Sequence, residues 1–132
     1  MNAYYHSLSS ARKFGGSWRD YFDIHTWIDG SKEFLADFRH RALRHHTEGV
    51  FAAERLFGAV LVNSDNKTIP VRLVAEQHIM EDLGRIPSVQ DWLLQITPQP
   101  WMNRVPVRST DLIKELEQCP TPPQTEQESE KP

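Results

Sequence analysis

The sequence has few of the features that mark secreted and membrane proteins. Cysteine occurs once in 132 residues, as Cys119, so no intrachain disulfide can form. The longest apolar run, residues 58–62, is far shorter than the roughly 18 residues that a membrane span needs. Residues 1–6 lack the charged and apolar regions of a secretory signal peptide. These absences predict a protein of a reducing, cytoplasmic setting that does not enter a membrane.

Motifs for nucleotide binding and nucleophilic catalysis are missing as well. The chain has only six glycines, and the pair Gly15-Gly16 follows an expected helix without the Lys-Ser/Thr pair of a phosphate-binding loop. The Gly-x-Ser-x-Gly motif of serine hydrolases is absent, and Cys119 is remote in sequence from every histidine. The sequence therefore disfavours both classes.

No excess of positive charge favours nucleic-acid binding. The formal net charge is −3, and residues 119–132 supply three glutamates against one lysine, so the rest of the chain is nearly neutral. The local exception is the set of arginines at positions 39, 41 and 44. Nucleic-acid contact through them is the weakest of the functional hypotheses.

Hydrophobic spacing predicts a mainly α-helical domain with one small β-hairpin. The expected helices cover residues 6–14, 18–28, 32–57, 72–83, 89–96 and 111–117, and the hairpin strands cover 59–62 and 68–71. We expect one globular domain over residues 1–118. Residues 119–132 are rich in Pro, Glu and Gln, a composition typical of a disordered tail.

The expected long helix, residues 32–57, carries an unusual residue on its inward side. Its apolar stripe by helical spacing is Leu35, Phe38, Ala42, His46, Gly49, Ala53 and Phe57. His46 thus occupies a place where an apolar residue is the norm. A buried imidazole must find a partner, because an unpaired buried polar group costs about 1–3 kcal/mol.

The histidines predict a metal site between two helices. His45-x-x-Glu48 and His78-x-x-Glu81 repeat one spacing, and Asp82 is a second carboxylate close to His78. We expect a divalent ion such as zinc, iron or manganese, because imidazole and carboxylate suit all three. The expected ligands are His46, His78 and either Glu81 or Asp82, with His6, His25 or His45 completing the set. The alternative is that these histidines only form structural hydrogen bonds.

Two further residues are candidates for catalysis in a metal-dependent hydrolase. Glu76 lies close to the inward side of its helix and is expected to reach Arg39 or His46, as a general base or to orient a metal ligand. Arg39 is suited to hold an anionic group such as phosphate, while metal-bound water is the nucleophile. The alternative is a polar network that only fixes how the two helices pack.

The competing class is a non-enzymatic interaction protein. Trp101 lies in a Pro-rich stretch beside Met102, and tryptophan is favoured at interface hot spots, so it is a candidate for a dimer or partner contact. Arg41 and Arg44 are candidates for a second contact surface. Replacing these residues separates the classes, because an interaction protein depends on them and a metalloprotein does not.

Several segments resemble a small uncharacterised family of bacterial and phage proteins. The similar strings are residues 6–7 and 13–16, residues 37–46, residues 70–72, 76–78 and 81–84, and residues 98–102. The resemblance covers about residues 4–102. The family has no assigned activity, so it implies no catalytic residue. It implies a prokaryotic or phage cytoplasm and, for a phage protein, a host defence or regulatory protein as the partner.

Overall fold

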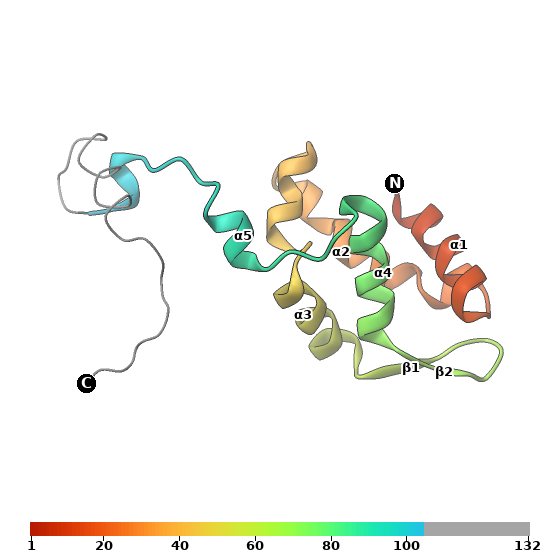
Figure 1. The fold of residues 1–132 in the computed structure, drawn as a ribbon. Helices are drawn as coiled ribbons and strands as arrows, with labels where there is room; N and C mark the ends of the chain where they lie inside the picture. Colours follow the sequence, from red (N-terminus) through yellow and green to blue (C-terminus); the bar gives the residue numbers. More distant parts are fainter. Residues whose placement is uncertain (105–132) are drawn as a thin grey trace, which may run out of the picture. The chain divides into compact units, whose positions relative to one another are not determined.

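The computed structural model describes residues 1–104 of the chain. The chain divides into two units, residues 1–95 and residues 96–132, and each is described by itself. The first unit is mainly α-helical with one two-stranded antiparallel sheet (Figure 1). Its elements are α1 (Ala3–Phe14), η1 (Trp18–Asp20), α2 (Phe22–Asp29), η2 (Gly30–Glu33), η3 (Phe38–Leu43), α3 (Thr47–Phe57), β1 (Val60–Val62), β2 (Thr68–Pro70), α4 (Val71–Leu83) and α5 (Val89–Leu93). The described part of the second unit contains η4 (Pro100–Met102).

Helix α1 and the 3₁₀ segment before α2 begin at local capping signals. The Asn2 side chain accepts a hydrogen bond from the Tyr5 N–H at the start of α1. Ser17 and Asp20 form a reciprocal capping box at η1, which precedes α2. Between them, Gly15 and Gly16 have φ angles of +90° and +75° and so end α1 in a conformation that favours glycine. The two predicted N-terminal helices are confirmed.

The prediction of one long helix over residues 32–57 is wrong. Two short 3₁₀ segments, η2 and η3, precede α3, which begins only at Thr47. Asp37 starts η3 by accepting a hydrogen bond from the Arg39 N–H, and His46 lies in extended backbone before α3. Polar side chains thus compete with the helical hydrogen bonds in this segment. Its apolar residues are not buried, and the Phe38 side chain is 64% exposed.

A close backbone approach helps to explain the break before α3. A Cβ atom on Gly49 would lie 2.0 Å from the carbonyl oxygen of Arg44, so only glycine fits at this position. The chain can therefore turn sharply before α3. The predicted end of this helix is correct, because α3 stops at Phe57 and Gly58 has a φ of +97°.

The hairpin and the following helix agree with their predictions. Strands β1 and β2 pair with Leu61 opposite Ile69, and α4 follows at once from Val71 to Leu83. Gly84 ends α4 with a φ of +75°. Ser88 and Asp91 form a capping box at the start of α5, which ends at Leu93 rather than at the predicted residue 96. The predicted helix over residues 111–117, the domain end at 118 and the tail lie outside the described residues.

Helix α4 contacts α1, α2 and α3, and Figure 1 shows it between α1 and α3. The core has an apolar part and a polar part. The apolar part consists of Tyr21, Ile24, Ile28, Val50, Ala53, Ile69, Val71, Val74, Ala75 and Ile79. The buried polar residues include His6, Ser10, His25, His45, Gln77 and His78. Within residues 1–104, no helix combines the length and apolar character that crossing a bilayer requires.

Candidate metal centre

Four histidines from four separate segments meet in the polar part of the core. His6 lies on α1, His25 on α2, His45 between η3 and α3, and His78 on α4, and each is fully buried. Two groups of side chains among them have ligand atoms close enough to share a metal ion. One consists of Asp29, His45, His78 and Asp82, and the other of His6, His25 and His78.

The group of Asp29, His45, His78 and Asp82 has the dimensions of a metal centre. The Nε2 atom of His78 lies 3.2 Å from Oδ1 of Asp29 and 3.2 Å from Oδ2 of Asp82. The Nε2 atom of His45 lies 2.9 Å from Oδ2 of Asp82 and 3.7 Å from Oδ1 of Asp29. Ligand atoms of a tetrahedral zinc site, with bonds of about 2.0–2.1 Å, lie about 3.3 Å apart. The four measured separations fall around this value.

The orientation of the rings separates the two groups. The rings of His45 and His78 meet edge to face, with centroids 5.0 Å apart, so their in-plane lone pairs can converge on one point. His6 instead stacks on His78 with centroids 3.7 Å apart and an interplanar angle of 24°. Lone pairs in two stacked rings run side by side and do not converge. The group with the two aspartates is therefore the better metal site.

Both aspartates of this group are held in the charged form. Burial raises the pKa of the Asp82 carboxyl, but the imidazoles of His45, His6 and His78 beside it outweigh burial and keep the pKa far below its usual range. Burial also raises the pKa of Asp29, and the hydrogen bond from His78 outweighs it, so this pKa is lowered too. Two carboxylates thus present negative charge to one buried point.

For His25, His45 and His78, burial lowers the pKa, but the opposing effect of the nearby carboxylates differs among them. Burial lowers the pKa of His78, but hydrogen bonds to Asp29 and Asp82 reverse the effect and raise the pKa above its ordinary value. For His45 burial prevails over the hydrogen bond to Asp82, and the pKa is lowered. Burial, with repulsion from His78 and His6, lowers the pKa of His25 to about 2. His25 and His45 are therefore neutral at pH 7, the form in which a histidine offers a lone pair.

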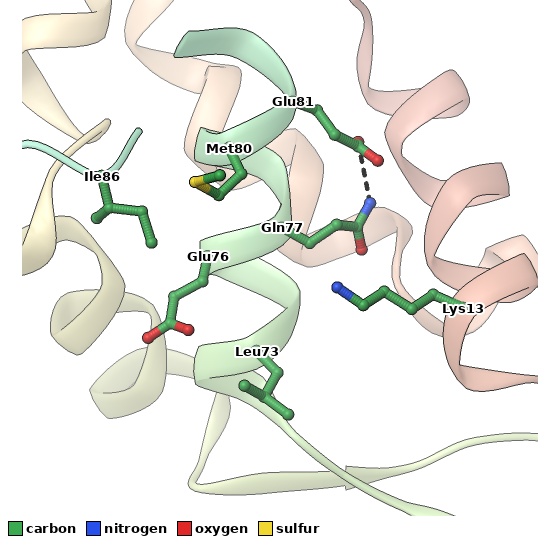
Figure 2. Close-up of a pocket in the computed structure, with 7 residues that line it drawn as sticks. All are labelled: Lys13, Leu73, Glu76, Gln77, Met80, Glu81 and Ile86. Carbon is green, nitrogen blue, oxygen red and sulfur yellow. Dashed lines mark hydrogen bonds between the residues drawn. The ribbon is translucent and has the colours of Figure 1, made fainter. Parts of the chain in front are cut away.

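A second layer of polar side chains lies beside the group of Asp29, His45, His78 and Asp82. His25 contacts the His78 ring through their Nδ1 atoms, 2.9 Å apart, and its Nε2 lies 2.7 Å from the Ser10 hydroxyl. The Ser10 hydroxyl donates to Oε1 of Gln77. Gln77 in turn donates to the Glu81 carboxylate, a hydrogen bond that Figure 2 shows beside a surface pocket.

His6 joins this layer from the other side. Its Nδ1 lies 2.8 Å from Oε1 of Glu81, and its Nε2 lies 3.2 Å from Oδ1 of Asp82 without the alignment of a hydrogen bond. Ser9 also donates to Glu81. Four buried atoms of the cluster have no hydrogen-bond partner, namely His6 Nε2, Asp29 Oδ2, His45 Nδ1 and Asp82 Oδ1. Such atoms are rare in cores, and they concentrate at this centre.

The expected ligand His46 lies outside both groups. Its Nδ1 accepts the N–H of Gly49 as the N-cap of α3, and its Nε2 lies 3.1 Å from the Leu43 carbonyl oxygen. Glu48, the carboxylate of the His45-x-x-Glu48 spacing, is exposed and accepts a hydrogen bond from the Val89 N–H. Because the helix breaks before residue 47, the neighbouring His45 enters the cluster in place of His46.

The expected catalytic pair, Arg39 and Glu76, is not brought together at the cluster. The Arg39 side chain is 67% exposed and forms an ion pair with Asp37. Glu76 lies on α4 in the surface pocket of Figure 2, which is also lined by Lys13, Leu73, Gln77, Met80, Glu81 and Ile86. The position of Arg39 follows from the broken helix, since Arg39 no longer lies on a helix that faces α4.

The three residues expected to contact a partner differ in their exposure and in their contacts within the chain. Arg44 donates a hydrogen bond to the Trp27 carbonyl oxygen and lies over the Trp27 ring, so it is committed within the fold. Arg41 lies 3.7 Å from Oδ1 of Asp82, at the edge of the cluster. Trp101 belongs to the second unit, where its side chain is 79% exposed. Only Trp101 keeps the exposure expected of a contact residue.

Asp29 was missed from the sequence. It was expected only to end a helix, yet its carboxylate faces His45 and His78. The signal was present as a repeated spacing, because His25 and Asp29 are four residues apart, as are His78 and Asp82. Residues four apart share a helix face, so each helix presents one histidine and one aspartate together.

The chain was compared with known protein families, curated proteins and solved structures. A family model described as a domain of unknown function (DUF6915) matches residues 1–102, so the chain belongs to this family. No curated protein matches the chain. No solved structure matches it either.

Proposed function

We propose that this member of the DUF6915 family binds one divalent metal ion through Asp29, His45, His78 and Asp82. The observation that carries the proposal is the set of four ligand-atom separations, from 2.9 to 3.7 Å, around one buried point. A divalent cation neutralises the two buried carboxylates there. It also removes the proton that His78 otherwise holds between them.

The ligand set indicates the class of metal. Two imidazole nitrogens and two carboxylate oxygens suit zinc, iron(II) or manganese(II), whereas thiolates are absent from the group. Four protein ligands complete a tetrahedral shell, which is typical of structural zinc sites. The ligands come from α2, from the segment before α3 and from α4, so the ion holds these parts together.

Hydrolysis, the reaction expected from the sequence, needs a coordination position open to water. Among the four side chains, Asp29 has the most exposure, and it is only 10% exposed. Arg39 and Glu76 do not line the centre. We therefore propose a structural ion, and a hydrolase screen of the metal-loaded protein tests the alternative.

The experiment is metal analysis of protein purified without a metal-affinity tag. The protein is stripped with a chelator, titrated with zinc, manganese(II) and iron(II), and analysed for bound metal. Asp29→Asn keeps the side-chain shape but removes a charged ligand, and Asp37→Asn is the matched control on the exposed surface. We expect one equivalent of metal in wild type and control, and a loss of affinity in Asp29→Asn. A folded wild type that binds none of the three ions would refute the proposal.

A cobalt(II) spectrum adds a test of geometry. Tetrahedral cobalt absorbs visible light more strongly than octahedral cobalt, so the four-ligand site predicts an intense visible band. The same band in Asp29→Asn, at unchanged affinity, would assign the metal to other residues.

Protein binding is a second candidate function, supported by an exposed apolar face. Phe34, Leu35, Phe38 and Leu43 are all exposed around η2 and η3. Exposed apolar patches mark interaction sites. Asp37 and Arg39 flank Phe38 but pair with each other, so this face offers its apolar side chains rather than an unpaired charge, and an identical apolar face on a second copy matches it.

We therefore propose a second copy of the chain as the occupant of this face. Sedimentation equilibrium of wild type and Phe38→Asp tests it. A dimer that Phe38→Asp dissociates supports the proposal, and a monomeric wild type excludes it. A partner protein of host or phage origin, implied by the sequence resemblance, would then be the candidate to search for.

A further inference from the structure

We propose that His25 is a positioning residue for the metal centre rather than a ligand. In this proposal the chain Gln77–Ser10–His25 holds His78 in the tautomer that presents Nε2 to the metal. The inference rests on the proposed metal site and assigns the inner and outer residues of the cluster. It follows from which group donates each hydrogen bond in the series that runs from Gln77 through Ser10 and His25 to His78.

The direction is set at Gln77, whose amide has two acceptors on one side. Its Nε2 lies 3.1 Å from the His6 carbonyl oxygen and 3.0 Å from the Glu81 carboxylate. A carbonyl and an ionised carboxylate can only accept. The NH₂ group of Gln77 must therefore face them, and its carbonyl oxygen must face Ser10.

Ser10 passes this direction on to His25. Oε1 of Gln77, 2.6 Å from the Ser10 hydroxyl, and the His6 carbonyl oxygen, 3.1 Å from it, can only accept, so Ser10 donates its single proton to one of them, and the shorter contact favours Gln77. Ser10 then has no proton left for the Nε2 atom of His25, 2.7 Å away. His25 must accordingly carry its proton on Nε2 and donate to Ser10.

The last link fixes His78. With its proton on Nε2, neutral His25 has a lone pair on Nδ1 and accepts there. The Nδ1 atom of His78 lies 2.9 Å away and must be the donor. The Nε2 lone pair of neutral His78 is therefore left for a metal ion, between Asp29 and Asp82. Metal-bound histidines commonly donate their second N–H to such an outer partner.

This assignment also explains why His25 is not a ligand. Its Nδ1 is the acceptor for His78, and its Nε2 proton is engaged with Ser10, so neither nitrogen is free for a metal. Oriented outer partners typically change metal affinity by about 10- to 100-fold.

The tautomer of His25 can be measured directly, with or without metal. Long-range ¹H–¹⁵N spectra of the imidazole rings distinguish a protonated from an unprotonated nitrogen. We expect a protonated Nε2 and an unprotonated Nδ1 for His25, and a protonated Nδ1 for His78 in the zinc-loaded protein. A protonated Nδ1 on His25 would overturn the proposal.

A variant tests the consequence for metal binding. Gln77→Leu removes the group that sets the direction but leaves all four ligands and their direct contacts. The matched control is Asn63→Leu, which removes another buried amide, one that bonds Phe14 and Tyr21 rather than any residue of the cluster. We expect Gln77→Leu to weaken zinc binding about 10- to 100-fold at unchanged stoichiometry, and Asn63→Leu to leave it unchanged.

The outcomes separate this inference from the function on which it rests. A wild type without bound metal refutes the metal site itself, while the tautomer of His25 is still measurable. Equal zinc affinity in Gln77→Leu and wild type refutes the positioning role alone. X-ray absorption at the zinc edge counts the nitrogen ligands of the bound ion. One nitrogen ligand fewer in His25→Gln than in wild type would make His25 a ligand and overturn the inference.

Discussion

The two halves of α4 are buried in opposite ways. Its first half presents Val71, Val74 and Ala75 to the apolar core, and all three are completely buried. Its second half presents His78 and Asp82, whose side chains are equally enclosed. One continuous helix thus contributes to an oily core at one end and to a charged cluster at the other.

The two ends of α4 differ in how specific their contacts with neighbouring residues must be. Apolar side chains need only close packing, which many arrangements supply. Buried ionisable groups need specific partners at specific distances, because an unpaired one is costly. Four atoms at the polar end have no hydrogen-bond partner, so this end is the one where a bound ion adds most.

The largest expected effect is the loss of Asp82 from the polar end. Asp82→Asn removes the charge that His45 and His78 contact, in a side chain that is 2% exposed. Breaking one partner of a buried ion pair costs about 3–5 kcal/mol. Urea denaturation of the metal-free protein measures it. A loss below about 1 kcal/mol would mean that the cluster contributes little to stability.

Metal binding should strengthen the polar end alone. At a free metal concentration one hundred times the Kd, the free energy of unfolding should rise by about 2.7 kcal/mol. Thermal unfolding with and without zinc measures the total. Hydrogen exchange locates it, and added protection confined to residues 71–75 rather than 78–83 would contradict the proposed site.

The pH dependence of stability isolates His25. Its folded pKa is about 2, so below pH 6.5 only the unfolded chain binds a proton there. Stability from this residue is complete above pH 6.5 and falls as the pH drops, by up to about 1.4 kcal/mol per unit. His25→Gln removes this dependence. Denaturation of both proteins between pH 7 and 5 tests it, and parallel curves would exclude a buried neutral His25.

A small change in the apolar core should be felt only as packing, even beside the cluster. Ile79→Val removes one methylene group from a core side chain that follows His78 on α4 and is 1% exposed. We expect a loss of about 0.5–1.5 kcal/mol. The loss should be the same with and without metal and at pH 7 and 5. A metal-dependent loss in calorimetry would show that the apolar core and the metal cluster are coupled.

The smallest effect is expected at Arg39. Its side chain is exposed and paired only with Asp37, so Arg39→Ala should change stability by less than about 0.5 kcal/mol. Metal affinity should not change either, which isothermal titration can measure. A clear loss of affinity would return Arg39 to the site where the sequence analysis placed it.

Local signals predicted much of the fold. The predicted hairpin and the predicted end of α4 depend on residues within a few positions of one another, as do the capping boxes that the structure shows at η1 and α5. Such local interactions can be inferred from residues that are neighbours in the sequence. The prediction of one long helix was wrong because helical spacing does not register what the Asp37 and His46 side chains do. Each accepts a hydrogen bond from a nearby backbone N–H and stabilises a non-helical conformation.

The sequence by itself determined that α4 would present His78 and Asp82 on one face. Helical geometry fixes that pair within a single turn. Only the tertiary structure decided that His45 rather than His46 completes the cluster, and that Asp29 faces it. These choices depend on where a break in the chain turns one residue inward, and on how α2, α3 and α4 pack. Interactions between residues far apart in the sequence set both, and no local pattern records them.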